Sequence, residues 1–183
     1  MAKTTGPLFS MDASGKFGGA LVFGKWKGRN TVRQLVTPSN PQSTNQEASR
    51  NAMRVMAEVQ RQMNLTTEKH AGDTLTDKAL FTAAAPSGQA WNGYLVKSGI
   101  GAGQVNYLAA QAAYAALTAP QKAAWVAGAE ALVPAILPVN QTVAGGGTGT
   151  ALTAGEVFFH AQYARYVAGL DAAAPTGTPP DYS

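Results

Sequence analysis

The side chains that could perform chemistry are few, and none of them lies at catalytic spacing. The sequence has no cysteine and only two histidines, His70 and His160, with few acidic residues near either. Thiol nucleophiles and thiolate metal sites are therefore excluded, and two histidines are too few for a histidine-rich metal centre. The ten acidic residues form no pair typical of general acid–base catalysis, and no serine lies in a Gly-x-Ser-x-Gly elbow. We therefore predict that the protein is not an enzyme and needs no cofactor or metal.

A glycine-rich run, Gly145–Gly149, raises the alternative of a phosphate-binding loop. No Lys-Ser or Lys-Thr pair follows it, no apolar strand precedes it, and the spacing of a dinucleotide-binding fingerprint is absent. The run therefore predicts a flexible loop near residues 144–150.

Positive charge is concentrated in the first third of the chain. Residues 1–64 carry a net charge of +6 and residues 65–183 carry −2. Basic residues gather around Trp26, and they are Lys25, Lys27, Arg29 and Arg33. Such a cluster is typical of surfaces that bind nucleic acid, and equally of protein interfaces, where Arg and Trp are enriched. Both alternatives stay open at this point.

The elements that position this cluster are predicted to be extended. Residues 16–26 and 31–37 are rich in β-formers, and Lys27-Gly-Arg-Asn30 between them favours a hairpin turn. Two prolines, Pro38 and Pro41, then hold the chain extended. We predict an N-terminal arm with a β-hairpin over residues 1–42.

A helical body is predicted over residues 43–170. Its first helix begins with a capping box, either Ser43 with Gln46 or Thr44 with Glu47. The apolar stripe of that helix is Ala48, Ala52, Val55, Met56, Val59 and Met63. Further helices are predicted at 76–84, 87–97, 104–117, 119–132 and 154–170.

Caps and apolar faces define the later helices. Thr118 with Gln121 and Thr153 with Glu156 are capping-box pairs. The predicted apolar faces are Val105, Leu108, Ala109 and Ala112; Trp125, Ala129 and Leu132; and Phe159, Tyr163, Tyr166 and Leu170. The proline-rich residues 171–183 predict an extended tail. The predicted fold class is mainly α, a short-helix bundle with a β-hairpin arm and an extended C-terminal tail.

No apolar stretch approaches the roughly 20 residues needed to cross a bilayer, and the first residues lack the apolar core of a signal peptide. We therefore expect no membrane partner and synthesis in a cytoplasm.

Three runs of sequence carry a resemblance to a known family. They are Phe17-Gly-Gly-Ala-Leu-Val-Phe-Gly-Lys-Trp-Lys-Gly-Arg-Asn-Thr-Val-Arg33, Val36-Thr-Pro-Ser-Asn-Pro-Gln-Ser-Thr-Asn-Gln46 with Arg50, and Leu117-Thr-Ala-Pro-Gln-Lys-Ala-Ala-Trp125. They resemble a family of small uncharacterised proteins of tailed bacteriophages and prophages. Ser43 stands where that family usually has Thr. The stretch between the second and the third of these runs is a long Ala- and Gly-rich insert. The resemblance implies a structural component of the virion and no catalytic residues.

The predicted function is accordingly a non-enzymatic bacteriophage virion structural protein. It would be capsid-associated, as a decoration or minor capsid protein, or a head–tail, connector or tail component. Its expected partners are other virion proteins and copies of itself in a symmetric, multi-copy assembly, with localisation in virions assembled in the host cytoplasm. The alternative is a nucleic-acid-binding protein that uses the basic N-terminal third.

The interface is predicted to include aromatic and basic residues of the arm and of the helix after it. They are Phe17, Phe23, Trp26, Lys27, Arg29, Arg33, Arg50 and Arg54. For each of them the alternative is packing against the protein's own body, and for Phe17 and Phe23 that alternative has equal weight. Changing Trp26→Ala is expected to impair incorporation into particles and to leave the body folded.

Overall fold

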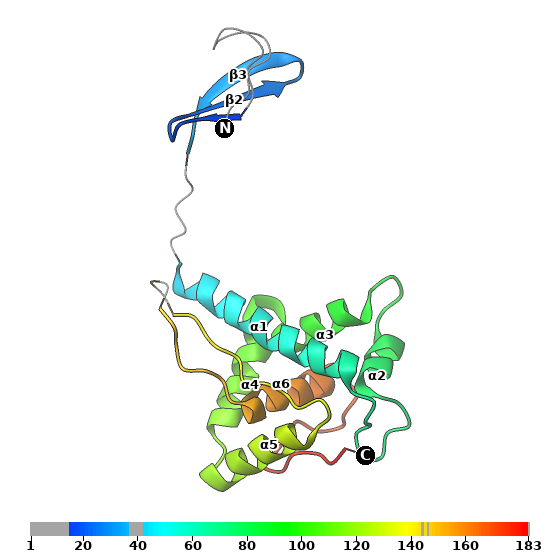
Figure 1. The fold of residues 1–183 in the computed structure, drawn as a ribbon. Helices are drawn as coiled ribbons and strands as arrows, with labels where there is room; N and C mark the ends of the chain where they lie inside the picture. The colour runs from blue at the N-terminus through cyan, green and yellow to red at the C-terminus, as the bar shows by residue number, and fades with distance from the viewer. Residues whose placement is uncertain (1–14, 37–41, 144, 146, 183) are drawn as a thin grey trace. The chain divides into compact units, whose positions relative to one another are not determined.

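The computed structural model describes residues 15–36, 42–143, 145 and 147–182. These residues are mainly helical, with a small antiparallel sheet near the start, which confirms the predicted fold class (Figure 1). The chain divides into two compact units, Met1–Pro41 and Gln42–Ser183. We call the described part of the first, residues 15–36, the sheet unit, and the described part of the second the body.

The sheet unit is a three-stranded antiparallel meander. Its strands are β1 (Gly15–Phe17), β2 (Leu21–Trp26) and β3 (Arg29–Gln34), with β2 in the middle. Lys27 and Gly28 alone connect β2 to β3, and both have positive φ, 48° and 79°. Positive φ at both central residues is the signature of a type I′ turn, whose twist matches the strands that it joins.

The meander corrects the predicted hairpin in two ways. The predicted strand over 16–26 is broken by a turn at residues 18–20, where Gly18 takes a positive φ of 57°. The predicted four-residue turn is a two-residue turn, so Arg29 and Asn30 belong to β3. Thr37–Pro41, predicted to be extended, lies outside the described residues.

The body is built from six helices and a 3₁₀ turn among its described residues. They are α1 (Thr44–Leu65), α2 (Asp77–Ala84), α3 (Trp91–Ile100), the turn η1 (Ala102–Gln104), α4 (Val105–Ala115), α5 (Ala119–Ala131) and α6 (Ala154–Val167). The helix predicted over 87–97 therefore lies three to four residues further on, and the one predicted over 154–170 ends earlier. Gly169 has a positive φ of 75° and follows the end of α6, as expected at a helix C-terminus.

The first body helix agrees with its prediction. Ser43 caps α1 through the capping box with Gln46, so the first of the two predicted boxes is the one formed. In the predicted stripe, Ala52, Val55, Met56, Val59 and Met63 are buried and Ala48 is partly buried. This stripe packs α1 against α3 and α6.

The predicted face of α4 is wrong. Val105 and Leu108 point to solvent, and the buried residues are Tyr107, Ala110 and Tyr114. Tyr107 stacks on His160 of α6, with ring centroids 4.8 Å apart, and Tyr114 meets Phe159 edge to face. Aromatic rings bury more area than Val or Leu, and this outweighs the aliphatic pattern.

Helix α6 lies at the centre of the body. It packs against α1, α3, α4 and α5 and is buried on nearly every side, whereas the sequence predicts a single aromatic face for it. A Cβ added at Gly155 would lie 2.6 Å from the backbone nitrogen of Val126, so this glycine allows α5 and α6 their close approach. Tyr166, assigned to the predicted face, is exposed.

The C-terminal tail is extended, as predicted, but its described residues pack against the body. Trp125 donates from Nε1 to the carbonyl of Thr176 over 3.0 Å. Further along, the Tyr182 hydroxyl donates to Asp77 Oδ2 over 2.7 Å and accepts from Gln162 Nε2 over 2.8 Å. We call residues 171–182 the C-terminal strap.

Candidate functional site

The strand register sorts the predicted interface residues of the sheet unit onto two faces. Residues that pair across antiparallel strands share a face, and neighbours along a strand alternate. Trp26 pairs with Arg29, and Val22 pairs with Arg33 on one side and Lys16 on the other. The other face carries Leu21, Phe23 and Lys25 of the middle strand, and Phe23 pairs there with Val32.

The first of these faces is basic, and we call it the basic face. It consists of Lys16, Val22, Gly24, Trp26, Arg29, Thr31 and Arg33. Trp26 is 68% exposed, and Arg29, Thr31 and Arg33 are exposed beside it. Thr31 Oγ1 donates to the Gly24 carbonyl over 3.0 Å, so the small centre of the face is fixed by a hydrogen bond. The register therefore divides the sequence cluster: Trp26, Arg29 and Arg33 share the basic face, Lys25 lies on the opposite face, and Lys27 lies in the turn.

The second face, which we call the apolar face, carries Leu21, Phe23 and Val32, with Lys25 beside Phe23 at its hairpin end. Phe23 is buried and Leu21 is partly buried, while Val32 is 49% exposed. Phe23 is thus already covered by residues of this chain. Lys27 lies in the turn between β2 and β3, with Nζ 5.8 Å from the centre of the Trp26 ring.

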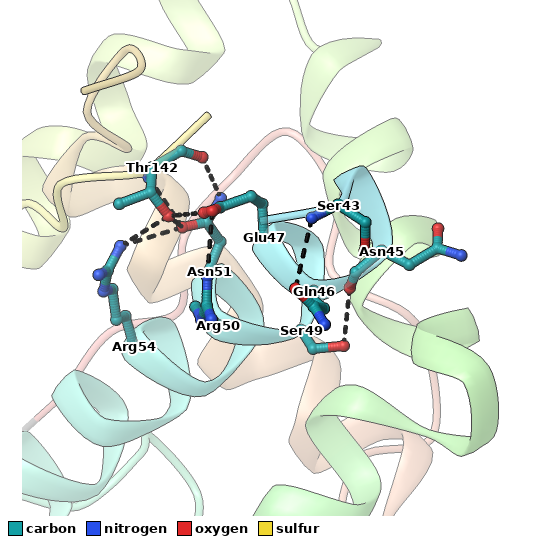
Figure 2. A network of polar contacts seen from close by, with 9 residues as sticks. All are labelled: Ser43, Asn45, Gln46, Glu47, Ser49, Arg50, Asn51, Arg54 and Thr142. Atoms are coloured by element: carbon teal, nitrogen blue, oxygen red, sulfur yellow. Dashed lines mark hydrogen bonds and ion pairs between the residues drawn. The ribbon is translucent and has the colours of Figure 1, made fainter. Parts of the chain in front are cut away.

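The two remaining predicted interface residues, Arg50 and Arg54, lie in the first turns of α1 (Figure 2). Arg50 Nη1 forms an ion pair with Glu47 over 3.1 Å. Arg54 Nη1 donates to Asn51 Oδ1 over 3.3 Å and to Thr142 Oγ1 over 3.1 Å. Both arginines are thus engaged within the body.

These contacts surround a clamp between Asn51 and Thr142, which Figure 2 shows at the centre of the network. Asn51 Nδ2 donates to the Thr142 carbonyl over 2.9 Å, and the Thr142 amide donates back to Asn51 Oδ1 over 3.0 Å. The Thr142 hydroxyl also donates to Glu47. The Asn51 amide side chain therefore pairs with both the backbone N–H and the backbone carbonyl of Thr142, as a neighbouring β-strand would. These two hydrogen bonds hold the loop before α6 against α1.

A cluster that the sequence did not predict lies around the buried guanidinium of Arg165. Nε and Nη2 donate to Asp171 over 3.0 and 2.8 Å, Nη2 also reaches Asp73 over 2.7 Å, and Nη1 pairs with Asp77. The signal that could have found it is a lone arginine within an otherwise apolar helix, since a buried charge needs partners.

The cluster sets one guanidinium against three carboxylates, each of which is paired with it. Burial lowers the pKa of Arg165, but the hydrogen bonds to Asp171 and Asp73 and the charge of Asp77 outweigh it, so the pKa is raised and the cation is kept. Burial raises the pKa of Asp77 against the opposing effects of Arg165 and Tyr182. The cluster joins α2, α6 and the C-terminal strap, which is a structural role.

The adjoining pocket of about 530 Å³ is lined by the strap, Trp125, Gln162 and the same Asp73 and Asp171. Both of these carboxylates are already paired with Arg165. Among the described residues no group of three or more His, Cys, Asp or Glu side chains is arranged to hold a metal ion.

His160 is a core residue. Burial lowers its pKa to about 4, and neither ring nitrogen has a hydrogen-bond partner in the described part of the chain. Its ring stacks on that of Tyr107 in the core.

No helix in the described segments is both long and apolar enough to span a bilayer. In comparisons with known proteins, no family model, no curated protein and no solved structure matches the chain.

Proposed function

We propose that the protein is a non-enzymatic structural component of a bacteriophage virion, which attaches through its sheet unit to other virion proteins. The observation that carries the proposal is the contrast between the two units. The body closes a core of its own, whereas Phe23 is the only buried side chain among those described in the sheet unit, and its strand partner Val32 is 49% exposed. Exposed apolar side chains beside polar ones are typical of protein interaction sites.

Two positions in the particle are considered, one on the capsid and one in the connector or tail. The body supplies a base tied together by the Arg165 cluster and the Asn51–Thr142 clamp. The sheet unit supplies the contact through its apolar face and through the edge of β3, which pairs with no second strand in the part of the chain that the structure describes. Capsid-associated and tail or connector positions are both compatible with this arrangement.

The proposal is tested by incorporation of a variant into particles. Val32→Glu puts a charge on the apolar face and should lower the amount of chain per purified particle at least about tenfold, as loss of an interface residue does. The matched control is Val105→Glu, because Val105 is 64% exposed at the first residue of α4, where an acidic side chain is tolerated.

A second variant, Val32→Thr, separates loss of binding from loss of the sheet, because threonine keeps the β-branched shape that favours a strand. It should lower the amount of chain per particle by an intermediate, few-fold factor. Quantitative mass spectrometry of particles, relative to the main shell protein, is the measurement. Normal occupancy of both Val32 variants would overturn the proposed attachment.

A further inference from the structure

We propose that the basic face binds single-stranded nucleic acid, with its cations on the phosphates and Trp26 stacked on an unpaired base. This activity goes beyond the proposed function, which uses the opposite face of the sheet. The charge, the spacing and the exposure of the residues on the basic face support it.

The charge of the sheet unit is of one sign. Residues 15–36 carry five basic side chains and no acidic one. None of these five has an ion pair among the described residues, whereas Arg50, Arg61 and Arg165 of the body are each paired with a carboxylate. A field of one sign without internal partners complements a polyanion, which carries a charge on every unit.

The spacing on the basic face suits an extended strand. Arg29 and Arg33 are four residues apart on β3, which places their Cα atoms about 13 Å apart along the strand. Lys16 lies across the sheet from Arg33, two strand spacings or about 10 Å away. Three cations therefore border a surface whose centre, Gly24 and Thr31, has only small side chains.

The aromatic residue lies beside this row of cations. Trp26 pairs directly with Arg29 at the hairpin end of the face, and most of its side chain is in solvent. Positive side chains along a backbone path with an exposed ring for a base are what proteins use to hold single strands. In a duplex the bases are stacked on one another inside the helix, so the Trp26 ring would find no unpaired base to stack on.

The experiment uses the full chain and a fluorescent oligothymidylate longer than the site sizes of about 4–16 nucleotides known for such surfaces. Three phosphate contacts predict that affinity falls about 20-fold between about 50 and 200 mM salt. With Arg29→Ala and Arg33→Ala together, one contact remains and the fall should be about threefold over the same range.

A matched control removes the same charge from the body. Lys69→Ala with Lys97→Ala changes two exposed lysines and should leave the affinity within about twofold of the wild type, since neither is part of the proposed site. Trp26→Ala should weaken binding to the single strand at least about fivefold, because stacking on one base is worth about 1–3 kcal/mol.

Two further probes separate the other partners. A duplex of the same length should bind more weakly than the single strand, and polyglutamate at equal charge should fail to displace the oligonucleotide. The proposal is overturned by absence of binding at low salt, by an equal loss in the lysine control, by tighter binding of the duplex, or by displacement with polyglutamate. These outcomes are independent of particle incorporation, so they leave the proposed function untouched.

Discussion

Acid should destabilise this protein through one buried side chain, His160. Its imidazole is stacked on Tyr107 in the core, and burial holds its pKa at about 4 against an ordinary value of 6.5. The unfolded chain therefore takes up this proton at a higher pH than the folded protein. As a result, the free energy of unfolding falls as the pH drops below 6.5, and the fall levels off below about 4.

The magnitude follows from the gap between the two pKa values. Each pH unit within the gap is worth about 1.4 kcal/mol, so His160 should cost the protein about 2 kcal/mol by pH 5 and about 3 kcal/mol by pH 4. Other groups also titrate in this range, so the quantity to compare is the difference between the wild type and a variant that lacks the imidazole. His160→Phe keeps an aromatic ring against Tyr107 and cannot take up a proton.

The assay is urea unfolding at several pH values between 7 and 4. The stability of His160→Phe relative to the wild type should rise by about 2 kcal/mol from pH 7 to pH 5, whatever its value at pH 7. Gln62→Met is the control, because Gln62 Nε2 is also buried without a hydrogen-bond partner among the described residues but does not titrate. If both variants follow the pH dependence of the wild type, the assignment of a buried neutral imidazole is wrong.

Three other substitutions test the contacts that hold the body together, each by its free energy of unfolding in urea. Asn51→Ala removes both hydrogen bonds to the Thr142 backbone and should cost about 2 kcal/mol, and a cost near zero would remove the clamp from the account. Arg165→Met leaves three carboxylates without their cation and should cost about 3–5 kcal/mol, whereas an unchanged stability would contradict the network. Gly155→Ala forces a Cβ against the α5 backbone and should cost about 3 kcal/mol, while Gly93→Ala, which has room, should be neutral or stabilising.

The elements that were predicted correctly are those whose signals are local. The capping residues Ser43 and Thr118 and the stripe of α1 depend on residues three or four positions apart, so the sequence displays them directly. The Lys27-Gly28 turn was placed within two residues for the same reason, because a hairpin turn depends on the backbone preferences of its own residues.

The features that were missed depend on contacts between distant residues. Arg165 and Asp77 are 88 positions apart, and Asn51 and Thr142 are 91 apart, so no spacing in the sequence announces either contact. The face of α4 was wrong because several alanines leave little contrast between its sides, and the tyrosines that are buried there carry a polar group. The strap was missed because its extended shape is local, while its anchor at Tyr182 is tertiary.

In the candidate site, the composition was enough to find the basic cluster, but not to tell on which face of the sheet each of its residues lies. Only the register of β1, β2 and β3 separates Trp26, Arg29 and Arg33 from Phe23 and Val32. A shift of one residue in that register would exchange the faces, which is why the division into a basic and an apolar face required the structure.

The central claim, that this chain is a structural part of a virion, is tested most directly by the protein inventory of purified particles. Mass spectrometry of purified particles should find the chain in a fixed ratio to the main shell or tube protein, and that ratio should survive a high-salt wash. Its absence from particles, while it is abundant in the lysate from which they were purified, would contradict the account.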